Sequence, residues 1–364
     1  VILPADCAWN SVEPSKLKPV TLPALKSVDS ATIREVAAGL RKHGARAAIM
    51  LTGLALREKP MEMAARICAA TGAKIFSQMS NGRVQRGAGR VAMPKIFYPI
   101  AKALEQLKDV AYLVLIGART PVGFFAYPGT PGRLGHDGCE VTALAKPGDD
   151  LPAAIDALAE AMGATRTAPA YIAPPRKEQP ALPTGRLDAD KACAIVSALL
   201  PENCIVCDES VSSGRSFYYD CHSAPQHDYI QLTGGAIGEG IPLAVGAAVA
   251  CPDRKVIGMQ ADGSGMYTVQ GLWTQARENL DVVTVVFANR TYQILHGEMR
   301  AVGVNDFGRN ATLMLNIDEP ALDWVSMARG MGVEAARATT AEEFASLFKA
   351  ALAKKGPFLI EAAI

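Results

Sequence analysis

The sequence predicts an α/β fold made of two doubly wound, Rossmann-like parallel-sheet domains joined by a Pro-rich linker. Three observations lead to this prediction. Short apolar runs alternate with segments of helical periodicity along the chain, which is typical of βαβ units. A stretch with five prolines, over residues 165–185, interrupts the alternation once. The length of 364 residues suits two domains that each bury a sizeable core.

The first domain is expected over residues 27–164, after a polar, Pro-rich linker over residues 1–26 that wraps a surface. Ser30 is the expected N-cap of the first helix, and Gly44 is expected to end it. Apolar runs and helical spacing then predict strands at 47–51, 74–77, 110–116 and 139–144, alternating with helices at 60–71, 95–107 and 151–162.

The second domain is expected over residues 186–364, where the alternation resumes after the interdomain linker. The domain is predicted to begin with a helix and to end with a helix followed by a strand. The predicted elements are helices at 188–200 and 341–353 and strands at 205–208, 255–260, 282–288 and 358–364.

Composition excludes several classes of function. The net charge of +1 gives no reason to expect binding to nucleic acid or to an anionic membrane. The sequence has no signal peptide and no apolar run long enough to span a bilayer. Its 8 cysteines form no disulfide pattern, so we expect reduced thiols and a cytoplasmic protein. Cys204 and Cys207 have redox or zinc spacing, but their apolar surroundings favour a buried strand.

The segment from Ala261 to Asn289 contains the chemistry that points to a site. One predicted strand ends directly before Asp262 and the next ends before Asn289, so both side chains emerge where open α/β sheets bind ligands. Their oxygens suit Mg²⁺. Gly263, Ser264 and Gly265 open the intervening helix, where N–H groups can face a phosphate. The pattern predicts a magnesium diphosphate site, and the alternative is a sharp turn with an Asp helix cap.

This segment resembles the thiamine diphosphate motif, Gly-Asp-Gly followed after the next strand by Asn, with Ala261 in place of the first Gly. Its wider context is similar to benzoylformate decarboxylase and acetolactate-synthase-like enzymes. The resemblance implies Mg²⁺ bound by Asp262, Asn289 and the Thr291 carbonyl. It further implies diphosphate contacts from Gly263 and the Ser264 and Gly265 amides, with Tyr267 beside the phosphates. For Tyr267 and Trp273, packing in the core is the alternative.

Gly234–Pro242 resembles the Gly-Gly loop of the same family, which bends the cofactor. The resemblance places Ile237 at the apolar wedge beneath the cofactor. It makes the Gly235 carbonyl an acceptor for the 4′-amino group. Glu239 departs from the pattern, because relatives often have an apolar residue there. The alternative is a glycine-rich strand-to-helix turn without a ligand.

Asp208–Ser213 resembles the second phosphate-side loop of the family, with Ser212 and the Val211 backbone as diphosphate contacts. A capped helix start is the alternative. Phe124 falls where benzoylformate decarboxylase has a proton-transferring histidine, which weighs against a direct copy of that enzyme. His296 either lines the substrate channel or faces solvent. No residue is assigned as a general acid or base.

The glycines between residues 129 and 138 precede a strand, so they do not form a dinucleotide fingerprint, and we expect a surface loop and no FAD.

The resemblance implies a thiamine diphosphate- and Mg²⁺-dependent lyase or transferase, acetolactate synthase-like, that decarboxylates a 2-oxo acid and releases the product or ligates it to a second carbonyl. A simple 2-oxo acid decarboxylase is the first alternative. A non-catalytic fragment or subunit is the second. A nucleotide-binding module is the third, although no base pocket is recognisable.

The resemblance also implies partners. The two predicted domains match the family's central and diphosphate-binding domains, and Val1–Asp6 reads as the last strand of a preceding pyrimidine-binding domain. The activating glutamate belongs to that domain, so we expect this chain to be a fragment that is inactive alone. The complete enzyme is expected to be a homodimer or homotetramer.

Overall fold

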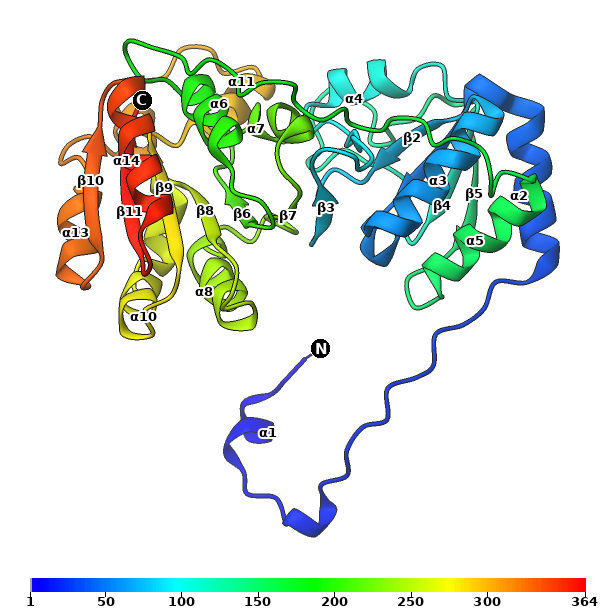
Figure 1. The fold of residues 1–364 in the computed structure, drawn as a ribbon, viewed down its shortest axis with the longest axis horizontal. Coiled ribbons are helices and arrows are strands. Elements are labelled where there is room, and N and C mark those ends of the chain that lie inside the picture. Colours follow the sequence, from blue (N-terminus) through cyan, green and yellow to red (C-terminus); the bar gives the residue numbers. More distant parts are fainter. Residues whose placement is uncertain (1) are drawn as a thin grey trace.

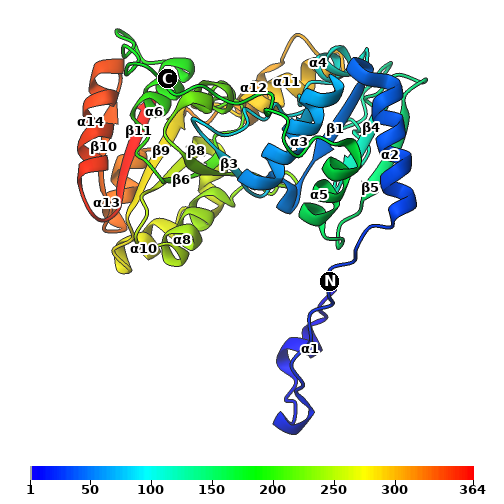
Figure 2. The same cartoon turned by 45° about the vertical axis from the view of Figure 1, so that its right-hand side comes forward.

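Two α/β domains lie side by side in the computed structural model, which describes residues 2–364 (Figure 1). Val1, where the expected linker and the expected preceding strand begin, lies outside the described residues. Residues 2–25 extend away from both domains and are exposed, so the prediction that they wrap a surface is wrong (Figures 1 and 2). Ala5–Trp9 forms the short helix α1, so this stretch is not a strand.

The first domain is built on a 4-stranded parallel sheet in the order β2-β1-β4-β5. Helices α2, α3 and α5 cover one face of the sheet and α4 covers the other. The strands are β1 (Ala47–Leu51), β2 (Lys74–Ser77), β4 (Tyr112–Ile116) and β5 (Glu140–Ala145), and the helices are α2 (Ser30–His43), α3 (Glu58–Thr71), α4 (Ile100–Leu107) and α5 (Leu151–Met162).

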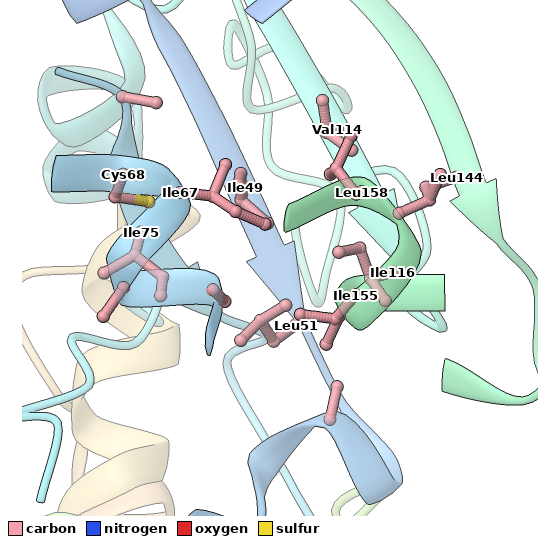
Figure 3. Close-up of a cluster of buried hydrophobic side chains, with 14 of the residues drawn as sticks. Ile49, Leu51, Ile67, Cys68, Ile75, Val114, Ile116, Leu144, Ile155 and Leu158 are labelled. Carbon is pink, nitrogen blue, oxygen red and sulfur yellow. The ribbon is translucent and has the colours of Figure 1, made fainter. Parts of the chain in front are cut away.

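The core of this domain has two layers because strand side chains alternate between the faces of the sheet. Ile49 and Leu51 of β1 point into the layer beneath α3 and α5, where they meet Ile67 and Ile155 (Figure 3). Met50, between them, joins the opposite layer beneath α4. The continuous apolar run of β1 is therefore buried on both sides, as expected for a central parallel strand.

The second domain contains a 7-stranded sheet in the order β10-β11-β9-β8-β6-β7-β3. Helices α6, α7 and α14 pack on one face, and α8, α10 and α13 pack on the other. The strands are β3 (Val84–Arg86), β6 (Ile205–Glu209), β7 (His227–Gln231), β8 (Val256–Ala261), β9 (Val282–Ala288), β10 (Glu334–Ala338) and β11 (Phe358–Ala363).

The helices of the second half are α6 (Ala189–Leu199), α7 (Phe217–Asp220), α8 (Gly240–Ala250), α9 (Asp262–Gly265), α10 (Gly271–Arg277), α11 (Gln293–Ala301), α12 (Arg309–Leu315), α13 (Trp324–Gly330) and α14 (Ala341–Ala353). Single 3₁₀ turns are η1 (Pro14–Lys16), η2 (Gly44–Arg46), η3 (Gly53–Leu56), η4 (Cys221–Ser223) and η5 (Met266–Thr268). Residues 165–185 contain no helix or extended strand, in keeping with a connecting segment. Among the described residues, no helix is long and apolar enough to cross a bilayer.

β3 belongs by sequence to the first half of the chain but pairs antiparallel with β7 at the edge of the second sheet. Every other pairing in that sheet is parallel. Arg86 of β3 is buried, and its guanidinium carbon lies 3.5 Å from the ring centroid of Tyr218 on α7. The two domains are therefore joined by a shared sheet as well as by the chain between them.

The strand order of the second sheet reverses at β6, because β7 lies on one side of it and β8 on the other. Such a switch point opens a crevice at the carboxyl ends of the strands, which is where α/β sheets bind ligands. The ends of β6, β8 and β9 therefore bring their following residues to one place.

Several element boundaries differ from the sequence prediction, and for α2 and α4 the local cause is clear. Asp29, not Ser30, caps α2, and its carboxylate accepts from the backbone amides of Ala31 and Thr32 at 2.9 and 2.8 Å. The helix predicted over 95–107 begins only at Ile100. Pro99 explains the shorter helix, because a residue before proline is driven out of helical conformation.

Candidate functional site

Asp262 follows β8 directly and is the first residue of α9, with only 3% of its surface exposed. Its Oδ1 accepts from the Gly263 amide at 2.9 Å, and its Oδ2 accepts from the Arg290 amide at 2.7 Å. Burial raises the pKa of Asp262 to about 6, although these two amides act in the opposite direction. A nearby cation would stabilise this buried carboxylate.

Asn289 follows β9 directly and forms one turn with the two residues after it. Its Oδ1 accepts from the Thr291 amide at 3.1 Å, and its Nδ2 donates to the Ser213 hydroxyl at 3.3 Å. Because Asp262 bonds the Arg290 amide inside this turn, the structure brings Asp262, Asn289 and Thr291 together as the sequence predicts. Their oxygens form a hard donor set of the kind that Mg²⁺ prefers.

Two of the five described non-glycine residues with positive φ lie in or near this turn. Arg290 has φ 56° and Val211, on the loop after β6, has φ 49°. Positive φ is rare for residues other than glycine, and for a β-branched residue such as valine it is an outlier. Non-glycine residues held in such conformations cluster at ligand sites.

The glycines of α9 are required by close packing. A Cβ at Gly263 would lie 2.4 Å from the Tyr292 ring, and a Cβ at Gly265 would lie 2.7 Å from the Trp324 ring. The Ser264 hydroxyl accepts from Gln260 Nε2 at 2.9 Å, so this side chain is already engaged. The amides of the first helical turn lack intrahelical acceptors. Because the Gly263 amide donates to Asp262, the amides of Ser264 and Gly265 are the donors available at this end.

The loop Gly234–Pro242 is organised by Glu209, the last residue of β6, to which the sequence analysis gave no role. Its buried carboxylate accepts from the Gly238 amide at 2.6 Å and also from the Gly240 amide. The Thr268 hydroxyl donates to the Gly238 carbonyl at 2.6 Å. An acidic residue that ends an apolar strand, far from any basic side chain in sequence, was the one signal for this role.

Glu239, the residue that departs from the family pattern, closes the same loop. Its Oε1 accepts from the Thr233 amide at 3.0 Å, and partial burial raises its pKa. The loop glycines Gly234 and Gly235 have φ 62° and 69°, so the turn needs residues that tolerate left-handed backbone.

The loop Asp208–Ser213 contacts Asn289 through the Ser213 hydroxyl. The diphosphate contacts expected of Ser212 and of the Val211 backbone stay predictions. Asp208 fixes the loop, because its carboxylate accepts from the Ser210 amide at 2.9 Å and from the Tyr229 hydroxyl at 2.5 Å. The alternative of a capped helix start is wrong, since residues 211–216 form turns and α7 begins only at Phe217.

Tyr267 and Trp273 are 64% and 52% exposed, so the alternative that they pack in the core is wrong. Met266 and Ile237 are also large, apolar and exposed. A Cβ at Gly238 would lie 2.7 Å from the Tyr267 Cβ, which places the Ile237 loop next to Tyr267. We call Ile237, Met266, Tyr267 and Trp273 the η5–α10 face.

A cavity of about 700 Å³ lies between the two domains. Val211, Gly235 and Ile237 line it from the second domain, whereas Asp262, Asn289 and Thr291 lie outside its lining. The first domain contributes mainly aromatic and basic side chains. Its lining residues include Lys95, Phe97, Tyr98, Lys102, Phe124 and Phe125, and the second domain adds Asp208, Arg215, Ile294, Leu295 and Glu298.

Phe124 closes the cavity against the glycine loop. A Cβ at Gly235 would lie 3.0 Å from the Phe124 ring. Phe125 packs edge-on against Phe124, with ring centroids 4.8 Å apart. His296 is not among the lining residues and instead bonds the Thr291 hydroxyl at 3.0 Å through Nε2. Of the two alternatives left open for His296, the structure does not show it lining this cavity.

Cys207 is buried within β6 and Cys204 is buried directly before it, which confirms the strand interpretation. Burial raises the pKa of Cys204 to about 12. No group of three or more His, Cys, Asp or Glu side chains that could hold a metal occurs within residues 2–364.

Comparison with known proteins identifies the family. The family described as "Thiamine pyrophosphate enzyme, C-terminal TPP binding domain" matches residues 213–362. A Mycobacterium tuberculosis protein named "Putative acetolactate synthase large subunit IlvX" is 45% identical over 366 residues, which cover 100% of this chain and 69% of that protein. Benzoylformate decarboxylase of Pseudomonas aeruginosa is 35% identical over 177 residues, covering 49% of this chain and 32% of the enzyme.

Solved structures agree with this assignment. The thiamine diphosphate-dependent 4-hydroxybenzoylformate decarboxylase of Rhodococcus jostii superposes with a TM-score of 0.73 at 25% identity, covering 94% of this chain and 66% of that one. Benzoylformate decarboxylase of Polynucleobacter necessarius, at 19% identity and a TM-score of 0.68, shares the fold. This chain thus spans about two thirds of the Rhodococcus enzyme's length. The resemblance in the sequence is confirmed, and the chain belongs to the family of thiamine diphosphate-dependent enzymes.

Proposed function

We propose that this chain binds thiamine diphosphate through Mg²⁺ at the carboxyl ends of β8 and β9. The observation that carries the proposal is the buried Asp262 carboxylate, which is bonded to the turn that contains Asn289 and Thr291. Asp262, Asn289 and the Thr291 carbonyl hold the metal. Gly263 and the amides of Ser264 and Gly265 face the diphosphate, with Val211 and Ser212 on its other side and Tyr267 beside it.

The glycine loop orients the cofactor. Ile237 would contact the cofactor through its apolar side chain, and the Gly235 carbonyl would accept from its amino group. Glu209 holds the loop in place through the Gly238 and Gly240 amides. When bound, thiamine diphosphate supplies an electron sink for decarboxylation. The cavity between the domains holds the 2-oxo acid, and its aromatic wall excludes water.

The proposed reaction is decarboxylation of a 2-oxo acid followed by ligation to a second carbonyl, as the acetolactate synthase name of the Mycobacterium relative suggests. Phe124 supports ligation, because no titratable side chain at this place can protonate a product. The second candidate is simple decarboxylation to an aldehyde, which the names of the Pseudomonas and Rhodococcus enzymes support.

The η5–α10 face supports a proposal on assembly. Large apolar side chains exposed together next to a ligand site mark a surface that another protein domain covers. We place a pyrimidine-binding domain there, which supplies the activating glutamate and completes the site in a homodimer or homotetramer. Without that domain the chain binds cofactor but does not turn over substrate.

Calorimetric titration of the chain with thiamine diphosphate, with and without Mg²⁺, tests the cofactor site. We expect Mg²⁺-dependent binding that weakens at least about tenfold in Asp262→Asn, because the metal loses its charged ligand. Asp253→Asn, at an exposed aspartate, is the matched control and should bind like the parent. Equal affinity in Asp262→Asn and Asp253→Asn would refute the proposed metal site.

Product analysis separates the two reactions once a pyrimidine-binding domain is supplied. Acyloin-type products support ligation, and an aldehyde alone supports simple decarboxylation.

A further inference from the structure

Two acidic side chains that line the interdomain cavity, Asp208 and Glu298, are already satisfied by neutral donors. Asp208 accepts from the Ser210 amide and from the Tyr229 hydroxyl. Glu298 accepts from the Tyr98 hydroxyl at 3.0 Å and from the Tyr127 hydroxyl. These carboxylates therefore need no cation from the cavity, and none of the basic residues that line it is paired with them within 4.0 Å in the described part of the chain.

The basic side chains of the cavity, in contrast, have no acidic partner. Neither Lys95 Nζ nor the Arg215 guanidinium forms an ion pair or a hydrogen bond with any described residue. Lys95 Nζ lies 4.4 Å from the ring centroid of Tyr218, and Arg215 lies 6.0 Å from that of Tyr98. Burial lowers the pKa of Lys95 to about 8, while Asp208 opposes this effect. An anion in the cavity would give the Lys95 ammonium the charged hydrogen-bond partner that it lacks.

A series of ring contacts connects the glycine loop, where the proposed chemistry occurs, to Arg215, whose charge also acts on Lys95. Phe124 touches the glycine loop at Gly235. Tyr98 packs against Phe124 with ring centroids 5.9 Å apart, and Arg215 sits over Tyr98. Two aromatic rings, those of Phe124 and Tyr98, lie along this series of contacts. With the carboxylate that is lost in decarboxylation placed at the glycine loop beside Phe124, Lys95 and Arg215 are left for another part of the substrate.

We propose that the cavity takes a 2-oxo acid whose side chain ends in a second anionic group, and that Lys95 binds this remote group. The proposal rests on the cofactor site proposed above for the position of the reacting end. The apolar body of the substrate lies between Phe97, Tyr98 and Phe124, and its terminal anion meets Lys95, with Arg215 nearby.

Protection of Lys95 from an amine-labelling reagent tests the anion site without the cofactor. The probes are straight-chain dicarboxylates from glutarate to suberate, each compared with the monocarboxylate of the same carbon number. We expect at least one dicarboxylate to slow labelling of Lys95 at least about fivefold, measured by peptide mass spectrometry, while its monocarboxylate does not. Lys349, exposed on α14, is the internal control and should label at the same rate throughout. Equal protection by both acids, or no protection, would overturn the remote-anion site.

Variants give a second readout. Lys95→Met should abolish calorimetric binding of the protecting dicarboxylate, whereas Lys95→Arg keeps the charge and should retain binding within about threefold. Binding that survives Lys95→Met contradicts the assignment of Lys95. A chain that binds the dicarboxylate but no thiamine diphosphate would refute the proposed function and leave the anion site in place, so the two failures are distinguishable.

In the complete enzyme, the kcat/KM ratio of 2-oxoadipate to 2-oxohexanoate measures the selectivity that Lys95 confers. We expect Lys95→Met to lower this ratio at least about tenfold by loss of 2-oxoadipate turnover alone. An equal loss for both substrates would contradict recognition of a remote anion.

Discussion

Glu209 and Asp262 are buried carboxylates that stand at the carboxyl ends of two adjacent strands, and backbone amides satisfy both of them. Glu209 bonds the loop proposed to bend the cofactor. Asp262 bonds the turn proposed to hold the metal. Because main-chain groups are the partners, the path of the chain and not the side chains of the loops sets the shape of the site. This explains why glycines and left-handed residues gather there.

His227 makes stability depend on pH. Its Nδ1 donates to the Pro225 carbonyl at 2.8 Å, Nε2 is buried without a partner, and burial lowers the pKa of His227 to about 4 from 6.5. The unfolded chain therefore binds more protons between these values, so stability should fall as pH falls from 6.5 to 4. The loss should approach roughly 2–3 kcal/mol.

Urea unfolding between pH 7 and pH 4.5 measures this loss. His227→Gln should flatten the dependence, and His136→Gln, at an exposed loop histidine, should leave it unchanged. A slope that persists in His227→Gln would assign the effect to other groups, of which His222 also has a pKa lowered by burial to about 4.

At the scale of elements, α11 connects the proposed metal turn to the first domain. Thr291 precedes α11, Ile294 and Leu295 on α11 line the cavity, and Glu298 bonds Tyr98 and Tyr127 across the domain boundary. Both tyrosines have their pKa raised, first by burial and next by Glu298, so they remain donors at neutral pH. The position of α11 is therefore set from both domains.

Glu298→Gln should loosen this connection, because a neutral amide accepts hydrogen bonds more weakly than a carboxylate. We expect faster hydrogen exchange over α11 and a loss of about 1–2 kcal/mol in unfolding free energy. Hydrogen–deuterium exchange with mass spectrometry measures the first effect. Glu160→Gln, at an exposed glutamate of α5, is the control. Unchanged exchange over α11 in Glu298→Gln would show that other contacts hold the helix.

Elements with a complete local pattern could be predicted from the sequence. β1, β2, α5, β9 and α14 occur with the predicted bounds, since each has an uninterrupted apolar run or a helical period with clear ends. β3, β7 and β10 were missed. β3 has three residues and exists only because β7 offers an edge for pairing. β3 therefore depends on a tertiary contact, and the local sequence does not predict it.

The same division holds for the site. Asp262, Asn289 and Thr291 could be predicted because each lies next to a strand end in one short segment. The roles of Glu209 and Ser213 and the contact of Phe124 with Gly235 could not, because their partners come from distant segments. No pattern in a single sequence encodes those distances.

At the scale of the whole molecule, the η5–α10 face is where we expect assembly. Trp273→Asp should leave folding intact, because the side chain is half exposed, but should prevent association with the pyrimidine-binding domain. Analytical ultracentrifugation measures the association. Leu313→Asp, at a similarly exposed apolar residue of α12, is the control and should still associate. Normal association of Trp273→Asp would place the interface elsewhere.

Because β3 comes from the first half of the chain but pairs with the second sheet, the two domains cannot be separated cleanly by a cut between them. A protease that cuts within residues 165–185 would leave two fragments. These fragments would stay associated through the β3–β7 pairing and through the contact between Arg86 and the Tyr218 ring. Residues 186–364 produced alone would expose the β7 edge, and such an open edge recruits other chains into aggregates. We therefore expect the pair of domains, and not either one alone, to be the unit that folds and that recombination can move between proteins.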